Sequence, residues 1–291
     1  MKQPKNTKAK PKTARRRGKM STLRKLALVA VGLMLLGAMF AAFVFFTRAG
    51  RDIGSRIPYL DKIYAYFFLK PKMPEADAYG IDVSHHQGTI DWTEVGLIPY
   101  DLATRNQGRR ESSAQVSIAF VMIKATEGCD YVDDCRATNM DGARKAGLLV
   151  GAYHVMTTGD AAEQAKNFFA NSGLAAGDMA PVIDLEESIL GGKKTAQARK
   201  TLKALVAKLE KRYGCKPIIY CGSRFSDDMN LAADYADYPR WIALYGSQQR
   251  PADSDVWQFT ERGTIPGIGG YVDLNAFYGR RFRLSELRVR R

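Results

Sequence analysis

Two kinds of residue that commonly hold metal ions are scarce in this sequence. The 291 residues include three histidines and four cysteines, and no two cysteines have the Cys-x-x-Cys spacing of a zinc site. His85 and His86 are adjacent, so in a strand they would point to opposite faces and could not both bind one ion. We therefore expect neither a metal site nor a cofactor.

Acidic residues are absent from the first 25 residues, which hold eleven lysines and arginines. This segment leaves only +3 of the net charge of +14 for the rest of the chain. A basic surface can attract nucleic acid, but here the charge belongs to a short tail. We expect no nucleic acid as a partner.

Charged residues are also absent from residues 26–46, a run of 21 residues. As a helix it would be roughly 30 Å long, which matches the hydrocarbon thickness of a bilayer. We predict a transmembrane helix over residues 26–47. A buried core helix and a cleaved signal peptide, with small residues at 38–42 for a peptidase, stay open as alternatives.

The distribution of positive charge predicts the orientation of this helix. The eleven cationic residues precede it, and only Arg48, Arg51 and Arg56 follow it closely. By the positive-inside rule, residues 1–25 form a basic cytoplasmic tail, held against anionic lipids, and the rest of the chain lies outside. We expect a single-pass protein of the cytoplasmic membrane with a periplasmic or other extracytoplasmic domain.

An outer compartment permits disulfides between the four cysteines. Cys129 and Cys135 flank a loop-like stretch and could close a short bridge. Cys215 and Cys221 flank a predicted strand, which would place their Cα atoms ~20 Å apart, so they cannot pair with each other.

The remaining sequence divides into a linker and one domain. Residues 48–78 are rich in aromatics, which favour the headgroup region near a membrane span, and we interpret them as a juxtamembrane linker or stalk. The domain covers residues 79–285. A long polar connection, residues 98–117, is expected to be a surface loop at the bottom or side of the domain.

Short β-rich runs alternate with amphipathic helical stretches throughout this domain. The runs are residues 79–83, 118–124, 148–155, 180–186, 217–221, 241–245, 256–259 and 271–274. The helical stretches are residues 135–147, 161–173 and 193–214. This alternation predicts an α/β fold, a modified TIM-like β/α barrel with eight mostly parallel strands. The last three runs leave little room for helices, so the last third of the barrel should be irregular.

Carboxylates occur where these strands are expected to end. Asp82 lies in the first run, Asp184 and Glu186 end the fourth, and Asp273 lies in the eighth. In such barrels the active site forms at the carboxyl ends of the strands. Residues two apart in a strand share a face, so Asp184 and Glu186 converge, and their repulsion would raise one pKa and keep a proton donor available.

Eight motifs place these acids in a known pattern. In chain order they are IDVSHHQGTIDW (81–92), FVMIKATEG (120–128), GAYHV (151–155), PVIDLEES (181–188), IIYCG (218–222), WIALYG (241–246), DVWQFT (255–260) and VDLNAF (272–277). Together they resemble glycoside hydrolase family 25, the Chalaropsis-type lysozymes, over about 200 residues. The resemblance implies a lysozyme (N-acetylmuramidase) that cleaves the β-1,4 bond between N-acetylmuramic acid and N-acetylglucosamine in peptidoglycan.

The resemblance also implies roles for individual residues. Glu186 matches the general acid, Asp184 its neighbouring carboxylate, and Asp82 and Asp273 the acids that complete the catalytic set. Asp184 would either orient the substrate's 2-acetamido group as an internal nucleophile or stabilise the transition state directly, and the sequence does not decide between these. The candidate substrate-binding residues are Tyr153, Tyr220, Tyr245, Trp257, Gln258 and His86. The expected partners are the peptidoglycan glycan strand and, through the N-terminal helix, the lipid bilayer.

Two other functions remain open. One is a metal-dependent polysaccharide deacetylase that uses Asp82 with His85 or His86. The other is a non-catalytic peptidoglycan-binding module that keeps the barrel and its groove. The pair Lys124 and Glu127 is interpreted as a structural ion pair rather than as catalytic.

Overall fold

A computed structural model describes residues 73–98, 116–247 and 249–291, together with helical residues between 31 and 43. The chain separates into two units, Met1–Asp61 and Lys62–Arg291. Of the residues described, none belongs to a helix long and apolar enough to cross a bilayer. The basic tail, most of the predicted span, most of the linker and residues 99–115 of the predicted loop lie outside the described residues.

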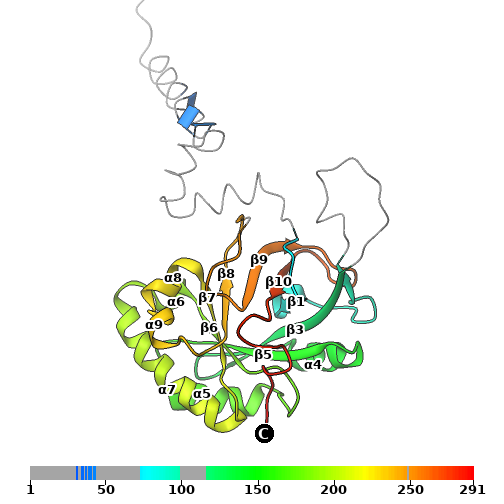
Figure 1. Ribbon diagram of the computed structural model, residues 1–291, viewed down its shortest axis with the longest axis vertical. Coiled ribbons are helices and arrows are strands. Elements are labelled where there is room, and N and C mark those ends of the chain that lie inside the picture. The colour runs from blue at the N-terminus through cyan, green and yellow to red at the C-terminus, as the bar shows by residue number, and fades with distance from the viewer. Residues whose placement is uncertain are drawn as a thin grey trace, which may run out of the picture. The chain divides into compact units, whose positions relative to one another are not determined.

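Eight strands of the second unit form a closed barrel (Figure 1). They are β1 (Ala78–Val83), β3 (Val116–Glu127), β5 (Leu149–Val155), β6 (Val182–Leu185), β7 (Ile218–Gly222), β8 (Arg240–Ala243), β9 (Val256–Gly263) and β10 (Val272–Phe277). The barrel closes because β1 pairs with both β3 and β10. Two short strands, β2 (Leu97–Ile98) and β4 (Tyr131–Val132), pair with β3. The eight predicted runs are confirmed.

One strand of the barrel runs against the others. The pairs from β1 through β3, β5, β6, β7 and β8 to β9 are parallel, whereas β10 is antiparallel to both β9 and β1. A connection of eight residues between β9 and β10 suits a hairpin but is too short for a parallel crossover. The prediction of a mostly parallel barrel with an irregular last third is confirmed.

The direction of β10 decides where its first residues lie. The parallel strands have their carboxyl ends at one end of the barrel, which we call the open end. We call the opposite end of the barrel the closed end. Because β10 is reversed, its start lies at the open end, and Asp273 there is paired with Asp82. From the sequence, Asp273 is expected near the carboxyl end of its strand. It instead lies at the amino end of a reversed one.

Helices cover the outside of the barrel (Figure 1). The longer ones are α4 (Arg136–Lys145), α5 (Ala161–Asn171) and α7 (Thr195–Tyr213). The short ones are α6 (Glu187–Leu190), α8 (Ser223–Asp228), α9 (Leu231–Asp234), η1 (His85–Gln87) and η3 (Gly192–Lys194). The helix α7 ends at Tyr213 and is followed by Gly214, whose φ of 68° lies in the left-handed region that favours glycine.

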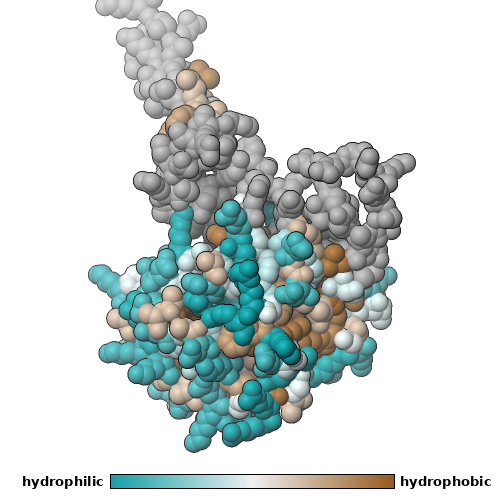
Figure 2. Space-filling view, in the orientation of Figure 1, coloured by the Kyte–Doolittle hydropathy of each residue, from teal (hydrophilic) through white to brown (hydrophobic). Residues whose placement is uncertain are grey.

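Apolar side chains form two layers because neighbouring residues of a strand face opposite sides. One buried cluster fills the barrel and includes Phe120, Met122, Val182, Ile218, Trp241, Val256, Phe277 and Leu287. A larger cluster lies between the strands and the helices. The face of this unit seen in Figure 2 is mostly hydrophilic, with apolar side chains in groups between polar ones.

The C-terminal segment packs against the closed end. The carbonyl of Leu287 accepts a hydrogen bond from the amide of Ala180, which lies just before β6, and Arg288 forms a bridge with Met179. Leu287 and Val289 are buried. The packed chain therefore continues past residue 285, the predicted end of the domain.

The four cysteines are free in the structure. The bridge that the spacing of Cys129 and Cys135 allows is not formed. Cys221 is a buried residue of β7, and Cys215 precedes that strand. The strand predicted between these two cysteines is therefore present.

Candidate active site

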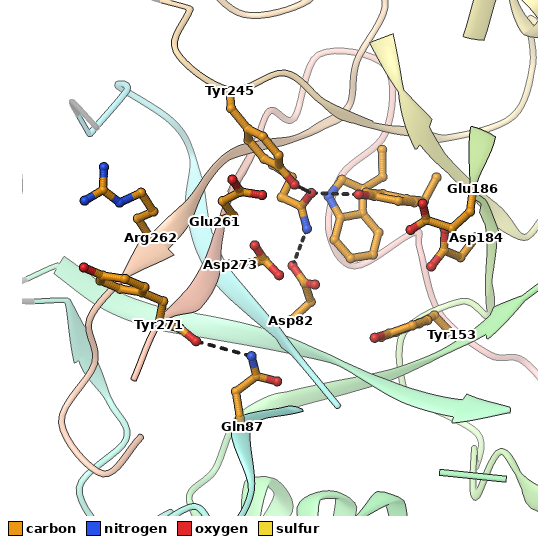
Figure 3. A pocket seen from close by; sticks show the side chains of 13 residues that line it. Asp82, Gln87, Tyr153, Asp184, Glu186, Tyr245, Glu261, Arg262, Tyr271 and Asp273 are labelled. Atoms are coloured by element: carbon orange, nitrogen blue, oxygen red, sulfur yellow. Dashed lines mark hydrogen bonds between the residues drawn. The ribbon is translucent and has the colours of Figure 1, made fainter. Parts of the chain in front are cut away.

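A pocket of about 420 Å³ opens at the open end of the barrel. It is lined by Asp82, Gln87, Tyr153, Asp184, Glu186, Tyr220, Trp241, Tyr245, Gln258, Glu261, Arg262, Tyr271 and Asp273 (Figure 3). All four acids named from the sequence are among these residues. The acids lie in β1, at the end of β6 and in β10, which are far apart in the chain. Closure of the barrel brings them together.

Asp82 and Asp273 form the centre of this pocket. They face each other across β1 and β10, and their carboxyl groups are hydrogen-bonded to each other. Burial raises the pKa of Asp82 to about 6. Burial, together with the charge of Asp82 and the hydrogen bond to it, raises the pKa of Asp273 to about 9. At neutral pH the pair therefore holds one proton, on Asp273, and one negative charge, on Asp82.

Two amides hold the charge on Asp82. Its Oδ2 accepts hydrogen bonds from Nε2 of Gln258 at 2.9 Å and from Nδ2 of Asn275 at 2.7 Å. Hydrogen bonds of this kind stabilise the ionised carboxylate. The amide of Asn275 is itself oriented by Trp241, whose Nε1 can only donate and lies 2.8 Å from Oδ1 of Asn275.

Two tyrosines orient the other amide. The hydroxyls of Tyr220 and Tyr245 donate to Oε1 of Gln258 at 2.8 and 2.6 Å, so its Nε2 must point to Asp82. Burial raises the pKa of both phenols well above the ordinary value, which keeps them as donors. The predicted residues Tyr220, Tyr245 and Gln258 thus form one network that ends on Asp82.

Asp184 and Glu186 differ in exposure although they are two residues apart. Asp184 is the third residue of β6 and is buried, whereas Glu186 follows the last strand residue and is exposed. Burial, followed by the charges of Glu186 and Asp82, raises the pKa of Asp184 well above its ordinary value. Among the described residues, Oδ1 of Asp184 has no hydrogen-bond partner. A donor from a bound molecule would satisfy it.

Tyr153 also lines the pocket, beside these acids (Figure 3). It is an inward residue of β5 and pairs with Val182 of β6. Burial and the surrounding carboxylates raise the pKa of its phenol well above the ordinary value. The side chain is therefore a neutral ring with a hydroxyl, suited to contact a sugar.

Trp257 does not line the pocket, in contrast to its predicted role. It precedes Gln258 in β9, and because Gln258 points inward, Trp257 points outward. Its Nε1 donates to the carbonyl of Leu244 at 2.9 Å, and its ring contacts that of Phe259. The indole at the pocket is Trp241.

The histidines also lie away from the pocket lining. Residues 85–87 form a 3-10 helix rather than a strand, because Ser84 and Gln87 form a capping box there. Nδ1 of His85 lies 2.7 Å from Asp133, and the ring of His86 packs on that of His85. Of the residues in this helix, Gln87 lines the pocket. His86, which was expected to contact substrate, is not among the lining residues.

His154 is a core residue. It follows the inward Tyr153 in β5 and so faces the helices, where Thr126 and Gln164 lie 2.7 and 3.2 Å from its ring nitrogens. Burial lowers its pKa to about 4. Its ring therefore packs within the fold and does not line the pocket.

The deacetylase hypothesis required Asp82 together with His85 or His86. Asp82 is instead bound by two amides, and His85 by Asp133. The part of the chain that the structure describes contains no group of three or more His, Cys, Asp or Glu side chains placed to hold a metal ion. The predicted ion pair is confirmed, with Nζ of Lys124 2.7 Å from Oε2 of Glu127.

Five lining residues were not predicted. They are Gln87, Trp241, Glu261, Arg262 and Tyr271. Trp241 could have been found from its strand, because alternation about Tyr220 and Gln258 in the neighbouring strands favours an inward Trp241. Glu261 and Arg262 carry no such signal, because they are adjacent and a regular strand would send only one of them inward.

Known proteins share this barrel and its sequence pattern. The family described as glycosyl hydrolases family 25 matches residues 81–268. The chain is 38% identical over 208 residues to the uncharacterized protein YegX of Escherichia coli K12, covering 69% of this chain and 70% of that protein. It is 31% identical over 226 residues to lysozyme M1 of Streptomyces globisporus, covering 72% of this chain and 70% of the lysozyme.

Solved structures agree with this match. A family 25 glycosyl hydrolase from Bacillus anthracis superimposes with a TM-score of 0.59 at 30% identity, over 72% of this chain and 92% of that one. The bacterial lysozyme from Streptomyces coelicolor gives 0.58 at 29% identity, over 72% and 96%. Three of the four carboxylates lie in the matched segment and Asp273 lies just beyond it, and all four line one pocket. The chain therefore belongs to glycosyl hydrolases family 25 and is a glycoside hydrolase of the lysozyme type.

Proposed function

We propose that the protein is a membrane-anchored lysozyme that hydrolyses the β-1,4 bond between N-acetylmuramic acid and N-acetylglucosamine in peptidoglycan, with Glu186 as general acid. The observation that carries this proposal is the unequal pair at the end of β6. A buried carboxyl, Asp184, and an exposed one, Glu186, line one pocket. Glycoside hydrolysis needs two carboxyl groups with different roles.

Glu186 supplies the proton in this mechanism. Its exposed position lets it reach the oxygen of a glycosidic bond lying across the pocket, and protonation of that oxygen makes the departing sugar a neutral alcohol. As the bond between C1 and this oxygen breaks, positive charge develops on the sugar ring. The negative charge held on Asp82 by Gln258 and Asn275 stabilises such a ring.

Asp184 orients the 2-acetamido group of the muramic acid residue. Its unpartnered Oδ1 accepts the acetamido N–H, and this hydrogen bond favours the ionised carboxylate. Of these two neighbouring carboxyl groups, Asp184 then carries the negative charge and Glu186 the proton. The acetamido oxygen attacks C1 as the glycosidic bond breaks, and a water activated by Glu186 then opens the cyclic intermediate with retention of configuration.

The test compares Glu186→Gln with the neighbouring Glu187→Gln in the full-length protein on purified peptidoglycan. Glu187 is exposed and is absent from the pocket lining, so it is the matched control. Mass spectrometry should find new muramic-acid reducing ends with the parent and with Glu187→Gln, and a rate at least ~100-fold lower with Glu186→Gln. If the folded parent releases no such ends from several wall types, the binding-module function is favoured instead.

We propose in addition that residues 26–47 anchor the protein in the cytoplasmic membrane, with residues 1–25 inside and the barrel in the periplasm or another extracytoplasmic space. The uncharged run and the basic tail before it support this. So do the exposed apolar side chains of helical residues such as Leu35, Met39 and Phe40. The anchor predicts that the full-length protein stays in the membrane fraction after carbonate washing. Recovery of the mature protein in the medium would contradict it.

A further inference from the structure

The pocket contains one basic side chain among several acidic ones. Five carboxyl groups line it, those of Asp82, Asp184, Glu186, Glu261 and Asp273. Of the lining residues in the described part of the chain, Arg262 is the single basic one. An anionic substituent in this pocket is attracted by Arg262 and repelled by each ionised carboxylate, so Arg262 decides where such a substituent can lie.

A β-bulge brings Arg262 to the pocket. Val272 pairs with Gly263 and Leu274 with Thr260, so Glu261 and Arg262 together lie opposite Asp273. A bulge of this kind breaks the alternation of faces and redirects side chains. It lets two adjacent residues line one pocket. The amide of Arg262 donates to Oγ1 of Thr260 at 3.0 Å, which holds the bulged backbone.

An aromatic ring supports the guanidinium. The guanidinium of Arg262 lies over the ring of Tyr271, 5.5 Å from its centroid. Tyr271 is itself held by Gln87, whose Nε2 donates to its carbonyl at 3.3 Å. A guanidinium is a planar group whose N–H donors can bind a carboxylate with two hydrogen bonds.

The position of Arg262 separates it from the bond-breaking groups. Figure 3 shows Arg262 and Tyr271 on the side of the pocket away from Asp184 and Glu186, with Asp82 and Asp273 between. A sugar whose C1 lies near Asp184 and Glu186 could therefore extend a substituent of its ring towards Arg262. Muramic acid differs from N-acetylglucosamine by a lactyl ether at its C3 hydroxyl, and this substituent carries a carboxylate, either its own or one of the attached peptide.

We propose that Arg262, packed on Tyr271, binds a carboxylate of the 3-O-substituent of muramic acid and so makes the enzyme select muramic acid over N-acetylglucosamine. This inference rests on the proposed lysozyme function. Arg262 acts as a specificity residue and takes no part in proton transfer. The bulge, the ring and Gln87 keep it in place before the substrate arrives.

The test compares Arg262→Gln, Arg262→Lys and the exposed control Arg280→Gln on four substrates. These are peptidoglycan with its peptides, the same glycan freed of peptides, that peptide-free glycan with its lactyl carboxylates converted to amides, and chito-oligosaccharides. Arg262→Gln should raise KM at least ~10-fold on a carboxylate-bearing glycan and leave kcat within about twofold. Arg262→Lys should recover part of this loss, and Arg280→Gln should match the parent.

The amidated glycan separates recognition from folding, because the same enzyme preparation is measured on both forms. On it the parent and Arg262→Gln should have equal KM values. A loss confined to the peptide-free glycan assigns the carboxylate to the lactyl group, and a loss on intact peptidoglycan assigns it to the peptide. An equal loss on the amidated glycan, or no loss on any substrate, overturns the inference. Failure of the parent to cleave any muramic-acid glycan refutes the proposed function itself.

Discussion

Asp82 and Asp273 lie opposite each other on antiparallel strands and share a single proton near neutral pH. The two are not equivalent. Asp82 receives two amide N–H groups on one oxygen, whereas Asp273 faces the charges of Asp82, Glu261 and Glu186. The amides therefore place the negative charge on Asp82 and leave the proton on Asp273, at the centre of the pocket.

This arrangement predicts how stability changes with pH. The folded pKa values of Asp82 and Asp273 are about 6 and about 9, both above the ordinary value. Between pH 4 and 9 the folded state therefore holds protons that the unfolded chain has released, so the free energy of unfolding falls as pH rises. Each group contributes at most about 1.4 kcal/mol per pH unit.

Asp273→Asn should remove part of this slope, because an amide cannot titrate. Urea unfolding of the parent and the variant between pH 5 and 8.5 measures it, with Asp130→Asn, which changes an exposed acid outside the pocket, as the control. Identical slopes for parent and Asp273→Asn would show that the shared proton is absent.

Gln258→Glu should impair catalysis through Asp82. The new carboxylate could still accept from Tyr220 and Tyr245, but it could not donate to Asp82 and would add a like charge beside it. We expect kcat/KM to fall ~10-fold or more at pH 6, and its pH profile to move to higher pH because the pKa of Asp82 rises. Gln258→Met is the uncharged comparison and should shift the profile less. An unmoved profile for Gln258→Glu would contradict the role of the network.

Two tryptophans should respond differently to the same change. Trp257→Phe loses a hydrogen bond to Leu244 on the outer face, so it should cost about 1 kcal/mol of stability and leave kcat/KM unchanged. Trp241→Phe removes the donor that orients Asn275, so it should lower kcat/KM as well. Thermal unfolding and initial rates on peptidoglycan measure both effects. A rise in KM for Trp257→Phe would restore it as a substrate-binding residue.

His154 should make the protein sensitive to acid. Its folded pKa of about 4 lies below the ordinary value of 6.5, so between these pH values the unfolded chain binds a proton that the folded state does not. The free energy of unfolding should therefore fall as pH drops from 6.5 towards 4. His154→Gln should reduce this fall, with the exposed His86→Gln as control. If parent and His154→Gln lose stability equally over this range, another group is responsible.

The sequence was sufficient to find the four acids, because each lies in a short apolar run bounded by turns. Asp184 and Glu186 lie in one predicted run, although the strand itself ends at Leu185, between them. Tyr153, Tyr220, Tyr245 and Gln258 were also assigned to the pocket, and all four line it. The acids follow from the predicted runs and from the rule that barrels place their sites at one end, whereas the tyrosines and Gln258 were assigned through the resemblance to the family.

Other features depend on contacts that local pattern does not record. The reversal of β10 is fixed by its pairing with both β9 and β1, and the bulge at Glu261 and Arg262 is visible only in the register between strands. The 3-10 helix His85–Gln87, which Ser84 caps, was not among the predicted elements. Trp257 was misplaced although alternation with Gln258 was available to correct it.

The chain enters the barrel at the end opposite the pocket, since β1 begins at Ala78 and carries Asp82 near its other end. The strand after the long connection, β3, begins at that end too. An anchor that precedes β1 in the chain would therefore be joined to the barrel at the end opposite the pocket. For a chain anchored as proposed, residues 48–77, which precede β1, could extend at most roughly 100 Å. The length of this segment would then limit how far from the membrane the enzyme can cleave. Shortening it should restrict cleavage to the wall layers nearest the membrane.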